Sequence, residues 1–221
     1  MDNFIFEFLT NLRKNNNREW FKQHKSNYDK ARKEVEAFID EEILPELSIV
    51  DPKLQNVSAK QCIFRIYRDV RFSKNKLPYK TAFGVFIGPA GRKSPTGYYL
   101  HIEPGKSFAG GGSYRPGPSV LKAIRSEIYF RPDAFKAILN NAAFKNIFGE
   151  IRGERLIRPP KGFPAAFPEI DLLKLKDFTV LHSISDDEIV RPDFGREVLN
   201  WFRHMKGLND FIYQAIENIE N

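Results

Sequence analysis

The spacing of apolar residues changes along the chain, from a helical period at both ends to an alternating period in the middle. Near the N-terminus, apolar residues recur every three or four positions in 4–12 and again in 20–47, which is the period of an amphipathic helix. In 62–72 they alternate with polar residues, as in a half-buried strand. The helical period returns after Pro118. The chain is therefore expected to be α+β, with a small, mainly antiparallel sheet flanked by N-terminal and C-terminal helices.

The length of 221 residues suits one domain with a sizeable core. We expect a single α+β domain over residues 1–221, with N-terminal helices in 1–50, a basic β-sheet region in 60–115 and a mainly helical part in 117–221. The expected strands are 62–72, 83–87, 98–103, 107–111 and one further strand at 177–184. Pro104 and Gly105 predict a tight turn between two of these strands.

Local signals predict where several helices begin or end. Asn17 is a candidate N-cap, and Pro118 and Pro132 suit the first position of a helix. Ser185 and Glu188 match the spacing of a capping box. Gly207 is expected to break the last helix, because glycine is a poor helix former.

Positive charge is concentrated in one third of the chain. The formal net charge of the whole chain is +7. Residues 60–115 contain eleven basic and two acidic residues, a net charge of +9, whereas 1–59 carry −2 and 116–221 are neutral. Such a local excess points to an anionic partner.

Other classes of site find little support in the sequence. Cys62 is the only cysteine, so an intrachain disulfide is excluded, and it is a poor match to metal-site or redox spacing. The four histidines lack metal-ligand spacing, so we expect no metal and no cofactor. No stretch approaches the ~18 apolar residues of a membrane span, and the first residues lack a signal-peptide pattern. A cytoplasmic protein that does not enter the membrane is the expectation, and nothing indicates its oligomeric state.

The basic region offers candidates for anion binding. On the expected strand, Arg65 and Arg71 share one face with Asp69, which can neutralise one of them, while Arg68 falls on the apolar face. Planar guanidinium groups suit phosphate or carboxylate. A loop stiffened by Pro78 follows, and a glycine-rich turn with a basic residue precedes a helix farther on. The candidate ligand-binding residues are Arg65, Arg68, Arg71, Lys76, Tyr79, Lys80 and Arg115.

Candidates for acid–base chemistry are few. His101 and Glu103 are two residues apart on an expected strand, so their side chains point to the same side. They form the best acid–base pair in the sequence, with Asp69 as a further candidate. A hydrogen-bonded pair with a purely structural role explains the same spacing.

Several motifs resemble those of one protein family. The segments 64–73, 76–81 and 107–116, the stretch from Phe8 to Phe21, and Lys174-x-Lys-x-Phe178 are similar to the domain-of-unknown-function family 2461. The similarity covers nearly the whole chain. It implies a single intact domain and supplies no activity, cofactor or catalytic residue.

Three functions remain open from the sequence. The favoured hypothesis is a small anionic ligand, bearing phosphate or carboxylate, bound in a basic pocket on the sheet, with or without an enzymatic step. The alternative is a nucleic-acid-binding module that uses the same basic face with its interleaved tyrosine and phenylalanine side chains. A third is an acidic protein partner. An ordinary solvated or carboxylate-paired surface also accounts for the charge.

Overall fold

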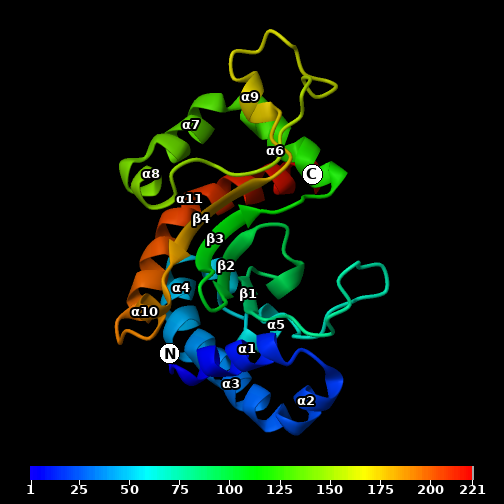
Figure 1. The fold of residues 1–221 in the computed structure, drawn as a ribbon. Helices are drawn as coiled ribbons and strands as arrows, with labels where there is room; N and C mark the ends of the chain where they lie inside the picture. Colours follow the sequence, from blue (N-terminus) through cyan, green and yellow to red (C-terminus); the bar gives the residue numbers. More distant parts are fainter. Residues whose placement is uncertain (221) are drawn as a thin grey trace. The chain divides into compact units, whose positions relative to one another are not determined.

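Four strands form the sheet of the computed structural model, which describes residues 1–220. They are β1 (Phe83–Ile87), β2 (Gly97–Ile102), β3 (Ser107–Ser113) and β4 (Phe178–Ile184), and they lie in the order β1-β2-β3-β4 in an antiparallel sheet (Figure 1). The predicted turn joins β2 to β3: Gly105 has a φ of 73°, and the Lys106 N–H donates to the Glu103 carbonyl at 2.9 Å. The α+β prediction is confirmed.

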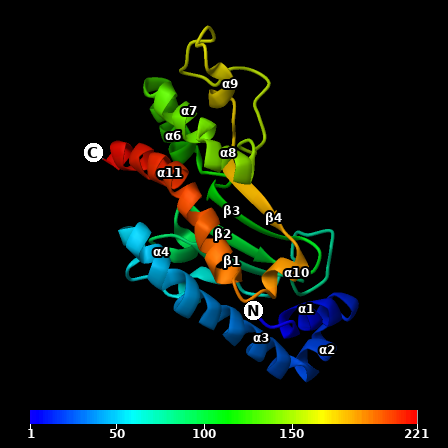
Figure 2. The same cartoon turned by 90° about the vertical axis from the view of Figure 1, so that its left-hand side faces the viewer.

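The N-terminal helices follow the predicted apolar pattern. They are α1 (Phe4–Lys14), α2 (Arg18–Gln23), α3 (Lys25–Ala37), a π-helical stretch (Phe38–Ile43) and α4 (Leu44–Val50). Figure 2 shows α3 leading towards α4 along one line. Asn17 is the N-cap of α2, as predicted, and its side chain accepts from the Trp20 N–H at 2.9 Å.

The later helices confirm most of the predicted ends. They are α6 (Pro118–Phe130), α7 (Pro132–Asn140), α8 (Ala142–Phe148), α9 (Ile170–Leu173), α10 (Asp186–Ile189) and α11 (Phe194–Glu220). Pro118 and Pro132 open α6 and α7, and Ser185 forms the capping box of α10 with Glu188. The prediction for Gly207 is wrong, because α11 continues through it.

The prediction of a strand over 62–72 is also wrong, because no regular strand forms there. Residues up to Cys62 belong to the short helix α5 (Ala59–Cys62), which begins with a capping box between Ser58 and Gln61. The segment that follows is extended. It forms only isolated antiparallel bridges: Ile63 pairs with Val85 of β1, and Tyr67 pairs with Tyr79, which precedes β1. The predicted alternation of exposed and buried side chains is present in part, because residues 65, 67, 69 and 71 are all exposed.

The contacts of the chain divide it into two compact units. The first comprises Met1–Lys93, Tyr99–Ala109 and Ser183–Asn200, and the second comprises Ser94–Tyr98, Gly110–His182 and Trp201–Asn221. The organisation of residues 1–221 as a single domain stays a prediction.

In the first unit, the two faces of the sheet differ in exposure. Val85 of β1 and Leu100 of β2 are fully buried on one face, which the N-terminal helices cover: the ring of Tyr28 in α3 stacks on Phe83 at 6.2 Å. The opposite face carries half-buried side chains, namely Phe86 of β1, Tyr99 and His101 of β2, and Phe108 of β3. This second face positions the candidate functional site.

The second unit has an aromatic core of its own. Phe135 of α7 is fully buried and packs on Phe178 and Phe211. Gly112 in β3 has a φ of 96°, and a Cβ there would lie 2.0 Å from the Phe178 carbonyl oxygen. Glycine is therefore required where β3 approaches β4.

Candidate functional site

Two basic side chains of the first unit lie over the ring of Phe64, and the charge of a third acts on one of them. We call Arg65, Lys80 and Arg92 the cation cluster. Lys80 Nζ lies 5.2 Å from the centre of the Phe64 ring, and Arg92 Cζ lies 6.0 Å from it. Arg65 is the residue next to Phe64, and its charge acts on Lys80. The cluster therefore combines two predicted ligand residues with Arg92, which was not among the predicted ligand residues.

Backbone pairing places the first two members of the cluster. The Phe64 N–H donates to the Gly84 carbonyl at 2.9 Å, and the Lys80 N–H donates to the Ile66 carbonyl at 2.8 Å. These bonds hold residues 64–66 beside residues 80–84. The outward position of Arg65 follows from the alternation of side chains in an extended chain.

Arg92 is brought to the same ring by a short turn. It lies in the 3₁₀ turn Gly91–Lys93, and its Nη1 donates to the carbonyls of Lys60 and Ile63. Gly91 has a φ of 56°, and a Cβ there would lie 2.6 Å from the Gln61 carbonyl oxygen. Only glycine allows the turn to approach the end of α5 so closely.

The cation cluster contains uncompensated positive charge. Burial, followed by the charges of Arg65 and Arg92, lowers the pKa of the Lys80 ammonium. Within residues 1–220, no carboxylate forms an ion pair with any of the three side chains. Like charges held together in this way favour the binding of an anion.

A chain of hydrogen bonds runs along the same face of the sheet. The Tyr99 hydroxyl lies 3.1 Å from His101 Nδ1, and His101 Nε2 lies 3.1 Å from Glu103 Oε2. We call these three side chains the relay. The predicted pairing of His101 and Glu103 on one side of a strand is therefore present, and Tyr99 extends it by two residues.

The relay is anchored at its carboxylate end. The Thr81 hydroxyl donates to Glu103 Oε1 at 3.1 Å, and Arg13 Nη2 of α1 lies 3.4 Å from the same oxygen. Burial acts to raise the pKa of the Glu103 carboxyl. The hydrogen bonds from His101 and Thr81, together with nearby positive charge, outweigh burial, so the pKa is lowered. Glu103 is therefore an ionised acceptor at neutral pH.

The phenol end of the relay is enclosed by aromatic rings. Tyr99 packs on Phe64 at 6.5 Å and on Phe108 at 5.5 Å, and the Phe108 ring stacks on His101 at 4.9 Å. Burial, and then the charge of Glu103, raises the pKa of Tyr99 to about 12. Its hydroxyl therefore keeps its proton.

Gly84 brings the relay next to the cation cluster. A Cβ at this position would lie 2.7 Å from the Tyr99 hydroxyl oxygen and 3.4 Å from Phe64 Cδ2. The hydroxyl and the Phe64 ring thus share the space beside Gly84, and Lys80 and Arg92 lie over that ring. Phe64 is therefore a neighbour of both the relay and the cation cluster.

The remaining predicted candidates lie elsewhere or are already engaged. Arg71 and Asp69 are exposed and form a two-bond ion pair, with Nε and Nη2 donating at 3.0 and 2.7 Å. The hydrogen bonds from Arg71 lower the pKa of Asp69. Lys76 Nζ donates to the Val70 carbonyl at 3.0 Å, and Arg68 is half-buried.

Tyr79 and Arg115 have other partners. The Tyr79 ring is buried and stacks on Phe21 at 4.0 Å, while its backbone exchanges two hydrogen bonds with the Asn16 side chain. Arg115 belongs to the second unit. It has a φ of 47°, and its N–H donates to Asp177 Oδ1 at 2.5 Å.

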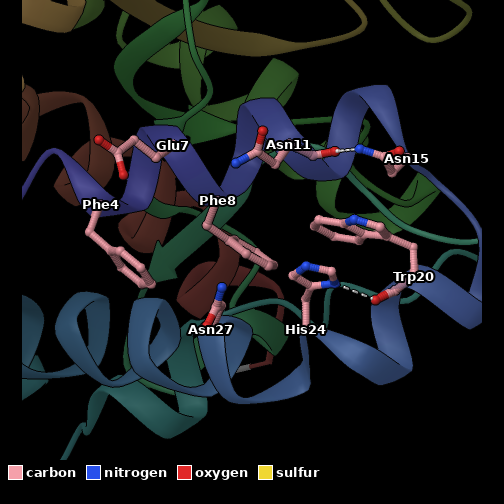
Figure 3. Close-up of a pocket in the computed structure, with 8 residues that line it drawn as sticks. All are labelled: Phe4, Glu7, Phe8, Asn11, Asn15, Trp20, His24 and Asn27. Carbon is pink, nitrogen blue, oxygen red and sulfur yellow. Dashed lines mark hydrogen bonds between the residues drawn. The ribbon is translucent and has the colours of Figure 1, made fainter.

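Two cavities of the first unit lie outside this surface. Lys76 lines an open depression of about 980 Å³ together with Pro78 and the residues around Asn17. A second cavity, of about 360 Å³, lies between α1 and the two helices after it and is lined by Phe4, Glu7, Phe8, Asn11, Asn15, Trp20, His24 and Asn27 (Figure 3). In it, the Trp20 and His24 rings stack at 4.0 Å, and His24 Nδ1 lies 2.9 Å from the Trp20 carbonyl oxygen.

Neither a metal cluster nor a membrane span is found in the described part of the chain. No group of His, Cys, Asp or Glu side chains within residues 1–220 could hold a metal ion. None of the described helices is both long enough and apolar enough to cross a bilayer.

Comparison with known proteins gives one match. The model of a family described as "Conserved hypothetical protein (DUF2461)" matches residues 4–211, which confirms the resemblance drawn from the motifs. No curated protein and no solved structure matched the chain.

Proposed function

The chain belongs to this family of conserved hypothetical proteins, and we propose that it binds a small anionic ligand at the cation cluster of Arg65, Lys80 and Arg92. The ligand carries a phosphate or carboxylate group. The proposal keeps the predicted ligand class, retains Arg65 and Lys80 of the seven predicted ligand-binding residues, and adds Arg92.

One observation carries the proposal. Two cations lie over a single half-buried ring, the charge of Arg65 acts on one of them, and no carboxylate in the described chain pairs with any of the three. Ordinary basic surface is screened by water or paired with acids, as Arg71 is with Asp69. Arg65 and Arg92 are exposed, but Lys80 is partly withdrawn from solvent and no carboxylate in the described chain pairs with the cluster, so an anion that binds there stabilises it.

Nucleic acid is the second candidate because of two exposed rings. Phe72 is 96% exposed and Tyr67 46% exposed, both on the basic segment that leads into the site. Exposed aromatic rings beside cations suit base stacking on a single strand. This candidate requires the segment around Arg71 and Phe72, whereas a small anion requires only the cation cluster.

A thermal-shift screen with inorganic phosphate, small carboxylates, nucleoside monophosphates and oligonucleotides separates the two candidates. The key variants are Arg65→Ala, within the cluster, and Arg71→Ala, an arginine six residues away that is paired with Asp69. For a small anion, we expect a ligand-dependent rise in Tm that Arg65→Ala abolishes and Arg71→Ala retains.

Two other outcomes are equally informative. If only oligonucleotides stabilise the chain, both arginine variants weaken the effect, and affinity falls with salt by about 0.7–0.9 log units per phosphate neutralised, then the second candidate holds. If no anion raises Tm, or if Arg65→Ala responds as the unaltered chain does, the proposed site is wrong.

A further inference from the structure

The relay has a defined hydrogen-bond direction while His101 is neutral. Glu103 is ionised, because its pKa is lowered, so it can only accept. His101 Nε2, 3.1 Å from that carboxylate, must therefore carry the hydrogen. A neutral imidazole has a single N–H, so Nδ1 is an acceptor and the Tyr99 hydroxyl donates to it.

In this arrangement the Tyr99 hydroxyl cannot donate a hydrogen bond to a ligand. A phenol has one hydrogen, and in this state it points to His101. The oxygen then presents only lone pairs to the Phe64 side, which repel an anion. If His101 takes up a proton on Nδ1, the bond reverses: Nδ1–H donates to the hydroxyl oxygen, and the phenol hydrogen is free to point away.

The freed hydrogen would face the proposed anion. The hydroxyl adjoins Phe64 across Gly84, and Lys80 and Arg92 lie over that same ring. Its raised pKa, about 12, keeps Tyr99 a donor rather than a phenolate. A neutral donor beside cations is a favourable partner for an oxyanion.

We propose that oxyanion binding at the cation cluster is coupled, through the Tyr99 hydroxyl, to the uptake of one proton from solvent by His101. The inference rests on the proposed function, since it requires an anion at the cluster. His101 of the relay then holds a proton while the ligand is bound. The expected ligands are therefore oxyanions that accept a hydrogen bond from a phenol. Phosphate monoesters fit best, because a dianion balances more of the cluster's charge.

The groups around His101 are polar at both of its nitrogens and aromatic over its ring. Tyr99 and Glu103 contact its two nitrogens, and Phe108 of β3 covers its ring. Arg13 of α1 is a positive charge near this group of side chains, and it contacts Glu103, with Nη2 3.4 Å from Oε1. Glu103 is in direct contact with Nε2, so a positive charge on the imidazole would have an anionic partner.

Calorimetric titration with sulfate measures the coupling. Sulfate is tetrahedral and stays a dianion near neutral pH, so any proton taken up on binding enters the protein. Titrations near pH 7, where an ordinary histidine is mostly neutral, are repeated in buffers of different ionisation enthalpy. The slope of the observed enthalpy gives the protons taken up per sulfate. We expect a value approaching one, and sulfate affinity that rises by up to about tenfold per pH unit lowered.

Three variants identify the side chain that takes up the proton. Tyr99→Phe should still bind sulfate but lose most of the proton uptake, because only the electrostatic part of the coupling remains. His101→Gln should lose all of it. Tyr67→Phe, which removes an exposed hydroxyl outside the relay, should behave as the unaltered chain does. Circular dichroism and Tm confirm that each variant is folded.

The outcomes separate the two proposals. Sulfate binding without proton uptake, or uptake that is unchanged in Tyr99→Phe, overturns the coupling and leaves the anion site standing. If the unaltered chain binds neither sulfate nor inorganic phosphate, the proposed function fails and the coupling fails with it.

Discussion

Replacing Lys80 by methionine is expected to stabilise the protein while removing its affinity for anions. Methionine keeps an unbranched apolar chain of similar length against Phe64 and removes the ammonium group. Lys80 is half-buried among positive charges, and its pKa is lowered. Its charge therefore disfavours the folded state, and the variant should be the more stable protein.

The size of the effect follows from the geometry of the cation cluster. Lys80 Nζ and Arg92 Cζ lie 5.2 and 6.0 Å from one ring centre, so they are at most about 11 Å apart. At that distance two like charges repel by about 0.4 kcal/mol in water and about 1.5 kcal/mol at an effective dielectric constant of 20. Because Lys80 is only half-buried, solvent screens part of this. A net gain of about 1 kcal/mol, or about 2–4 °C in Tm, is expected.

The gain should depend on pH in a definite direction. Lys80 has a folded-state pKa below its ordinary value of 10.5, so the folded chain releases this proton more readily than the unfolded chain. The penalty is fully present at neutral pH and fades as pH rises through the lowered pKa towards 10.5. The difference between Lys80→Met and the unaltered chain should therefore shrink in alkaline buffer.

Urea unfolding at neutral and alkaline pH, with Lys74→Met as the matched control, tests this reasoning. Lys74 is exposed in the loop that precedes Lys80, so its replacement should change stability by less than about 0.5 kcal/mol. Added inorganic phosphate should stabilise the unaltered chain and Lys74→Met but not Lys80→Met. If Lys80→Met is less stable than Lys74→Met at neutral pH, the cluster is not a site of uncompensated repulsion.

Three further predictions concern the scaffold. Asn17→Ala removes the side-chain acceptor for the Trp20 N–H and should cost about 1 kcal/mol in urea unfolding; no loss would show that this cap is dispensable. Gly112→Ala places a Cβ 2.0 Å from the Phe178 carbonyl oxygen at a φ of 96° and should destabilise by about 3 kcal/mol or more, which a near-native Tm would contradict. Burial raises the pKa of Cys62 to about 12, so a thiol reagent at about pH 8 should label it only after denaturant is added, and rapid labelling of the folded chain would refute its burial.

The sequence predicted which side chains in 62–72 face outward better than it predicted the backbone. Arg65 and Tyr67 are exposed and Ile66 is buried, as an alternating pattern requires. A regular strand does not form, because its partner segment contains Pro78, which has no N–H to donate. The pairing is limited to isolated bridges. The capping box at Ser58 also extends α5 up to Cys62, a local signal that the alternating pattern obscured.

The candidate site was predictable only where its residues are close in the sequence. His101 and Glu103 were found because a spacing of two places them on one face of a strand. Arg92 was missed because its approach to Phe64 depends on the positive φ of Gly91, which connects residues almost thirty positions apart. Tyr99 was visible at the same spacing of two, but its role depends on the small size of Gly84 across the sheet.

A crystal structure of the chain grown with tungstate, a heavy tetrahedral oxyanion, tests the central claim most directly. The anomalous signal of tungsten locates a bound anion without reference to its shape. We expect a peak beside Phe64, within hydrogen-bond reach of Lys80, Arg65 or Arg92 and of the Tyr99 hydroxyl. A peak at Arg71 or in the cavity beside Trp20, with none at the cation cluster, would contradict the account.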